Sequence, residues 1–281
     1  MNFELNQELP EYTVVARNFA DQSHNTIHRD DVATQFGYKG NLVPGVGVYA
    51  YMTVPITEAL GETWLEHGTM SAKFIKPFYE GETITIRSKV IHIDPLRILI
   101  SALNDHEVLC GLGEASLLDA HAESVSILDF PLHHMPLEAE RLAPTEGTIP
   151  NDYPLGTMEF TIDLSDSKSE YAQFLNDIDA TQKLYHGKHA HYHPAHIVLC
   201  ANQVLYRNLA IDPWIHIASD VRYHALPREG EAVALRGRIA HTYMKRGHLI
   251  ALSELGFIGE QERLLAHLTH TTIIQSAWAA K

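Results

Sequence analysis

Polar and apolar residues alternate along several short runs of the chain, as in residues 83–87 (Thr-Ile-Thr-Ile-Arg). This period of two is typical of a strand that buries one face. Similar β-forming runs recur in both halves of the sequence. We expect strands at 11–18, 69–75, 83–93, 97–103, 108–118, 215–223, 232–242, 249–258 and 263–274.

Two longer stretches have the spacing of helices instead. In residues 195–209, apolar positions recur three and four apart, which predicts one buried face. These positions are Ile197, Cys200, Ala201, Val204 and Leu205. Residues 46–60 follow Pro44, have only Gly47 and Pro55 as breakers, and predict a second long helix that packs on a sheet. A short helical turn is expected at 30–36.

A repeat relates the two halves of the chain. Residues 73–82 and 222–231 each contain a basic residue, an aromatic residue, a proline and then Glu-Gly-Glu, in that order. The glycines of these segments, Gly81 and Gly230, lie 149 positions apart, and neighbouring matches keep an offset of 149 or 150. Chance is the alternative, because proline and glycine mark turns in every protein. A constant order over about 50 residues favours a duplicated unit.

The repeat predicts two units of the same design. We expect a first unit at 1–130, a linker at 131–154 that is rich in proline, and a second unit at 155–281. A long helix followed by antiparallel strands, twice, is an α+β architecture. The expected arrangement is two antiparallel sheets, each wrapping a long central helix.

Composition and charge narrow the classes of function. The formal net charge of −14 makes nucleic acid an unexpected partner, because acidic proteins repel phosphate backbones. No apolar run approaches the ~18 residues of a membrane span, and the first residues lack the pattern of a secretory signal. The two cysteines, Cys110 and Cys200, form neither a disulfide framework nor a metal pair. We therefore expect a cytoplasmic protein without a membrane partner.

Residues 12–118 carry a family resemblance. The segment 25–30 (Asn-Thr-Ile-His-Arg-Asp), then Ala33, residues 36–38 (Phe-Gly-Tyr) and 42–45 (Leu-Val-Pro-Gly), is similar to the active-site segment of MaoC-like (R)-specific enoyl-CoA hydratases and acyl dehydratases. Residues 74–77 (Phe-Ile-Lys-Pro) and 81–82 (Gly-Glu) resemble a strand turn of the same family. The resemblance implies a double hotdog fold, in which one unit keeps a working site and the other accommodates the acyl chain.

The resemblance also implies a chemistry. It implies a hydro-lyase that adds water to an enoyl thioester or removes it from a 3-hydroxyacyl thioester, carried by CoA or by an acyl carrier protein. The catalytic histidine of the family falls on His28 and its asparagine on Asn25. The helix-start glycine falls on Gly45, and we expect Gly45, Val46 and Tyr49 to bind the substrate. No cofactor is implied.

Two positions depart from the family pattern. The catalytic aspartate of the family falls on Ser23, and its helix-start histidine falls on Pro44. Asp21 could supply the missing acid, although a surface turn explains it equally well. Ser23 and His28 could instead form a nucleophile–base pair, but no Gly-x-Ser-x-Gly elbow surrounds Ser23.

These departures leave three functions open. The first is the hydratase or dehydratase. The second is a hotdog thioesterase, in which water attacks the thioester carbonyl. The third is a non-catalytic acyl-binding subunit. A homodimer is a further open expectation.

Two sets of residues stay without an assigned role. Five histidines lie close together before the second long helix, and they could bind a metal or enter a cleft; we expect no metal, because no carboxylate is interleaved. They are His186, His189, His191, His193 and His196. The basic residues that could meet a CoA phosphate are Lys73, Lys76, Arg87, Lys89, Arg97, Arg222, Arg228, Arg236 and Arg238.

Overall fold

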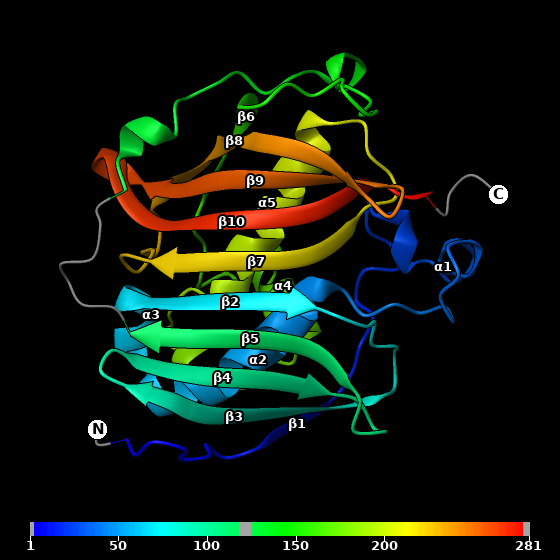
Figure 1. Cartoon of the computed structure of the whole chain (residues 1–281). Helices are drawn as coiled ribbons and strands as arrows, with labels where there is room; N and C mark the ends of the chain where they lie inside the picture. The colour runs from blue at the N-terminus through cyan, green and yellow to red at the C-terminus, as the bar shows by residue number, and fades with distance from the viewer. Residues whose placement is uncertain (1–2, 118–124, 278–281) are drawn as a thin grey trace.

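The computed structural model describes residues 3–117 and 125–277. In this part of the chain ten strands form one antiparallel sheet, and two long helices lie behind it in the view of Figure 1. The strands are β1 (Tyr12–Val15), β2 (Gly68–Phe74), β3 (Thr83–Ile93), β4 (Leu96–Leu103), β5 (Leu109–Leu117), β6 (Tyr153–Thr161), β7 (Ile215–Tyr223), β8 (Ala232–Lys245), β9 (His248–Gly259) and β10 (Arg263–Gln275). The α-helices are α1 (Asp30–Gln35), α2 (Gly45–Leu60), α3 (Glu62–His67), α4 (Glu170–Asp177) and α5 (Pro194–Asn208). Single 3-10 turns are η1 (Thr26–His28), η2 (Ile127–Asp129), η3 (Glu138–Glu140), η4 (Lys183–Tyr185) and η5 (Glu260–Glu262).

The order of the strands is the same in both halves of the sheet. From one edge it runs β1-β3-β4-β5-β2, and from the other edge β6-β8-β9-β10-β7. Adding five to each strand number of the first half gives the second half. This is the arrangement that a duplicated unit produces.

The two halves meet where β2 pairs with β7. The pairing is antiparallel and runs from Thr69 opposite Arg222 to Lys73 opposite Ala218. The prediction of two separate sheets is therefore wrong: the halves share one continuous sheet. The physical reason is that each half alone would leave β2 or β7 with unpaired backbone groups, and these edges satisfy one another.

The sequence repeat corresponds to one turn built twice. Gly81 and Gly230 both have a positive φ, of 83° and 75°, which is the left-handed conformation that glycine adopts most easily. In each turn the glutamate after the glycine accepts a hydrogen bond from a backbone N–H three residues earlier. Glu82 accepts from Tyr79 at 3.0 Å, and Glu231 accepts from Arg228 at 2.9 Å.

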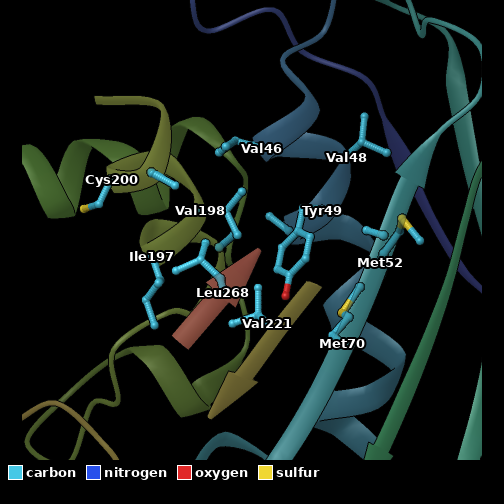
Figure 2. Close-up of a cluster of buried hydrophobic side chains, with 14 of the residues drawn as sticks. Val46, Val48, Tyr49, Met52, Met70, Ile197, Val198, Cys200, Val221 and Leu268 are labelled. Carbon is cyan, nitrogen blue, oxygen red and sulfur yellow. The ribbon is translucent and has the colours of Figure 1, made fainter. Parts of the chain in front are cut away.

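The core lies between the helices and the sheet. Helices α2 and α5 pack against one another, and their apolar faces meet the central strands. Figure 2 shows side chains of α2 and α5 gathered with Met70 of β2, Val221 of β7 and Leu268 of β10. Both predicted long helices are confirmed to within a residue at each end.

The second unit also contains a strand, β6, that the sequence pattern did not predict. Strand β6 begins at Tyr153, inside the last two residues of the expected linker. Its Pro154 is a residue that interrupts strands, and it was assigned to the proline-rich linker. The proline is accommodated because β6 is an edge strand of the sheet, where one side of the backbone needs no partner.

Two of the five clustered histidines are core residues. His193 caps helix α5 by accepting a hydrogen bond from the N–H of Ala195 at 3.1 Å, and His196 lies one turn further along the helix. Burial lowers the pKa of each to about 3, and His196 contributes further to the shift of His193. Both are therefore neutral near pH 7. In the described ranges no cluster of three or more His, Cys, Asp or Glu side chains could hold a metal ion.

Among the helices of the described residues, none is both long and apolar enough to span a bilayer.

The buried histidines predict that the fold loses stability in acid. An unfolded histidine binds a proton below about pH 6.5, whereas folded His193 resists protonation until about pH 3. Each such histidine therefore lowers the free energy of unfolding as the pH falls below 6.5. The loss is about 2 kcal/mol per histidine at pH 5. His193→Asn keeps a capping oxygen but cannot titrate, so urea unfolding should show a smaller loss between pH 7 and pH 5 for this variant. His106→Asn, at an exposed loop position, is the control; an equal pH dependence in all three proteins would contradict the account.

Candidate active site at the junction of the two units

A pocket of about 420 Å³ opens where the first unit meets the second. Its walls are mostly apolar, and they come from both halves of the chain. The first unit contributes η1, the start of α2 and the end of β2. The second unit contributes one face of α5 and the beginning of β7. The face of α5 consists of Leu199, Asn202, Gln203 and Tyr206. A concave, apolar site of this size is typical of small-molecule binding.

Asn25 ties the two units together beside this pocket. Its side-chain amide donates to the carbonyl of Trp214 at 2.9 Å and accepts from the N–H of Trp214 at 3.1 Å. The next residue, Thr26, donates its N–H and its hydroxyl to Asp212, each at 2.8 Å. The family-like segment of the first unit is thus held against the loop that precedes β7. Asn25 lines the pocket, but both polar atoms of its amide are used in this clamp.

His28 lines the same pocket with a defined tautomer. Its Nδ1 lies 3.0 Å from the carbonyl oxygen of Leu42, so Nδ1 carries the proton and donates it. The other nitrogen, Nε2, therefore carries a lone pair. Burial lowers the pKa of His28 to about 4, against a smaller opposing effect of the Leu42 carbonyl. His28 is a neutral base at pH 7.

The start of helix α2 forms another wall of the pocket. Pro44 precedes the helix, and its carbonyl accepts from the N–H groups of Gly47 and Val48. The N–H groups of Gly45 and Val46 are the donors that a helix start leaves without an intrahelical partner. Both residues line the pocket. These donors, with the positive end of the helix dipole, favour a partly negative oxygen.

A second histidine reaches this helix start from the other unit. His216 of β7 lines the pocket, and a Cβ placed on Gly45 would lie 3.1 Å from its Nδ1. The same Cβ would lie 3.0 Å from the ring of Phe74, which meets the His216 ring edge-on at 4.8 Å. A side chain at position 45 would therefore be tight, because Phe74 or His216 would have to move by a few tenths of an ångström.

Three other residues were predicted for the site, and each has a different environment in the structure. Ser23 lines the pocket, but its hydroxyl is hydrogen-bonded to the backbone of Asn25, at 3.3 and 3.4 Å. Asp21 is exposed and accepts a hydrogen bond from Gln22. Tyr49 is buried in the core, where its hydroxyl meets that of Tyr223 at 2.7 Å (Figure 2 shows it pointing from α2 toward the sheet).

Several basic candidates for a CoA phosphate are paired with carboxylates. The pairs are Arg87 with Glu11 and Glu107, Arg97 with Glu114, Arg236 with Glu262, and Arg238 with Glu254 and Asp152. Lys76, which follows β2, lines the pocket.

Sequence reasoning missed His216 and the polar residues behind it. One signal was available in β10, where Leu268, His270, Thr272 and Ile274 alternate and all point inward. Two polar residues in an otherwise apolar inward series indicate a buried polar site.

Solved structures of other proteins share the fold that builds this site. No family model and no curated protein sequence matches the chain. Solved structures do: a provisionally assigned MaoC domain dehydratase from Chloroflexus aurantiacus has a TM-score of 0.63 at 13% identity, over 98% of this chain and 97% of that chain. The chain has the double hotdog fold.

Two further structures show how widely this fold is used. RV0216, a conserved hypothetical protein from Mycobacterium tuberculosis described as a double hotdog, has a TM-score of 0.60 at 13% identity, with 96% of each chain covered. A provisionally assigned oleoyl thioesterase from Lactobacillus plantarum has a TM-score of 0.56 at 10% identity, over 96% of this chain and 98% of that chain. Dehydratases and thioesterases thus share this double hotdog, and the fold alone does not choose between them.

The clamp of Asn25 predicts a structural cost when it is removed. Asn25→Ala leaves the N–H and the carbonyl of Trp214 without their partner in a buried place. Each such group costs about 1–3 kcal/mol, so urea unfolding should show a loss of roughly 2–6 kcal/mol. Asn25→Asp keeps the acceptor for the N–H but turns a buried carboxylate oxygen toward the Trp214 carbonyl, so it should not recover the loss. Equal stability of the alanine variant and the wild type would contradict the clamp.

Proposed function

We propose that this double hotdog is an enzyme of the hydratase and dehydratase type that acts on acyl thioesters. The observation that carries the proposal is the neutral His28, whose Nδ1–H is committed to Leu42 and whose Nε2 is free to accept a proton, in an apolar pocket beside the start of α2. The acyl chain occupies the pocket between α2 and the face of α5. The thioester is carried by CoA or by an acyl carrier protein.

The reaction requires one group that moves a proton and one site that holds developing charge. In hydration, His28 Nε2 takes a proton from water while the water oxygen bonds to C3 of the enoyl chain. The π electrons of the double bond move to the thioester oxygen, which accepts hydrogen bonds from the N–H groups of Gly45 and Val46. The protonated His28 then returns its proton to C2, and the thioester carbonyl re-forms. Dehydration follows the same steps in reverse.

A thioesterase is the second candidate, and a specific observation supports it. Among the described residues that line the pocket there is no aspartate or glutamate. The family-like pattern has an aspartate at the position of Ser23, so one of the two groups expected for hydration is missing. Attack of water on the thioester carbonyl needs only a base and an oxyanion site. In that reaction His28 would take the water proton and pass it to the leaving thiolate.

One assay separates the candidates. The protein is incubated with crotonyl-CoA and with longer enoyl-CoAs, and the loss of enoyl absorbance and the release of thiol are followed together. Loss of absorbance without thiol supports the hydratase, and thiol release supports the thioesterase. Binding of the esters without turnover indicates the third alternative, a non-catalytic acyl-binding protein, and would contradict the proposal.

His28→Ala should lower kcat/KM by roughly 10²–10⁴-fold, because general acid–base catalysis contributes about this much. His106→Ala, at an exposed loop position, is the matched control and should keep full activity. Unchanged turnover in the His28 variant would exclude His28 as the base.

The pH dependence gives an independent check. Because the pKa of His28 is lowered to about 4, its neutral form persists through the range from pH 6 to pH 8, and kcat/KM should be flat there. Protonation removes the base only as the pH falls toward about 4. A decline centred near pH 6.5, in protein that is still folded by circular dichroism, would show that His28 is not the group that titrates.

A further inference from the structure

The pocket contains one polar atom whose partner is missing. His216 Nδ1 is buried and makes no hydrogen bond within the part of the chain that the structure describes. The residue as a whole is 9% exposed, and Nδ1 lies against Gly45 at the start of α2, where the Phe74 ring meets the His216 ring edge-on. Burying an acceptor without a partner is costly, so such an atom in a pocket indicates a ligand that completes it.

The tautomer of His216 follows from a chain of hydrogen bonds that begins at Trp214. The indole Nε1–H can only donate, and it lies 3.4 Å from Asn202 Oδ1, which must therefore be the amide oxygen. That oxygen lies 3.2 Å from His270 Nε2, so His270 Nε2 carries a proton and donates it. His270 is neutral, because burial lowers its pKa to about 3. Its Nδ1 is then an acceptor.

This chain of hydrogen bonds continues from His270 through Ser219 to His216. The Ser219 hydroxyl lies 2.9 Å from His270 Nδ1 and donates its proton there. The same hydroxyl oxygen lies 2.8 Å from His216 Nε2, and it accepts the Nε2–H. Burial, together with the neighbouring His270, lowers the pKa of His216 well below its usual range, against a smaller effect of the Ala218 carbonyl. His216 is neutral, its proton is on Nε2, and Nδ1 carries a lone pair.

The lone pair of His216 Nδ1 determines which chemical groups can bind at the start of α2. It repels a carbonyl or carboxylate oxygen and accepts a hydrogen bond from an O–H or N–H group. In the proposed reaction the thioester oxygen and C2 are not such donors. Only the reacting water, or the 3-hydroxyl group that it becomes, carries an O–H at the reacting carbons.

We propose that His216 Nδ1 holds the reacting water or the substrate 3-hydroxyl by accepting its hydrogen bond, and that Ser219, His270 and Asn202 are positioning residues that keep Nδ1 free to do so. This inference rests on the proposed function. The second unit then supplies the water-binding group that the first unit lacks at Ser23, while His28 moves the proton. The ring of Phe74, which is partly exposed, lies edge-on against the His216 ring at 4.8 Å.

The tautomer can be tested without any substrate. In the ¹⁵N-labelled full chain, the ring nitrogens of His216 should give an unprotonated Nδ1 and a protonated Nε2 from pH 6 to pH 8. Ser219→Ala removes the acceptor of the Nε2–H and should give a mixture of tautomers. Ser253→Ala, a buried serine outside the chain of hydrogen bonds, is the control and should leave His216 unchanged. A protonated Nδ1 in the wild type, or no change in the Ser219 variant, would overturn the proposal.

Kinetics test the role in the reaction. His216→Leu should lower kcat by roughly 10²-fold with little change in KM, and His216→Asn, whose amide oxygen can replace the Nδ1 lone pair, should recover part of that loss. An increase in KM alone, which disappears with a thioester that lacks the amides of the pantetheine arm, would show that His216 binds that arm instead and would overturn the proposal. If no thioester is turned over, the proposed function and the role of His216 in it both fall, while the tautomer measurement still reports on the hydrogen-bond chain.

Discussion

The pairing of β2 with β7 is the constraint on which the rest of the structure depends. Each unit has a strand edge that would be left with unpaired backbone groups, and the two edges satisfy one another in an antiparallel ladder. The ladder joins ten strands into one sheet and brings α2 and α5 side by side behind it. It also carries the beginning of β7 to the start of α2, and so creates the pocket between the units. Neither half of the chain has this pocket by itself.

The same junction explains the electrostatic character of the site. The protein carries a net charge of −14, yet the described lining of the pocket has no carboxylate. His28 in its wall and His270 behind it are neutral, because burial lowers the pKa of His28 to about 4 and that of His270 to about 3. Their hydrogen-bond partners, rather than charge, therefore decide which nitrogen can accept a proton or a hydrogen bond. An apolar pocket with a few oriented donors and lone pairs suits a long acyl chain with one reactive thioester.

Much of the fold could be predicted from the sequence, because local patterns determine it. The bounds of β3 and β7 were predicted to the residue, and the Glu-Gly-Glu repeat marked a turn that is built twice. Strand β6 was missed because Pro154 is tolerated only by its position at the sheet edge, which is a property of the whole sheet. The single sheet was missed for a similar reason, since the pairing of β2 with β7 depends on residues about 150 positions apart.

The candidate site was only partly predictable. The family resemblance pointed to His28, Gly45 and Val46, and the structure brings all three to one pocket. It did not indicate that Asn25 clamps Trp214, because that contact crosses from one unit to the other. His216 could not be found from the repeat, because the offset of 149 pairs it with His67, an exposed residue at the end of α3.

The central claim is that one thioester pocket is built jointly by both units. The most direct measurement is a crystal structure of the full chain with an unreactive acyl-CoA analogue, in which an ether or an amide replaces the thioester. The account predicts that the acyl chain lies between the start of α2 and the face of α5, with its carbonyl or ether end near the N–H groups of Gly45 and Val46. Binding confined to another surface, such as the groove lined by Tyr12 and Arg17 beside β1, would contradict it.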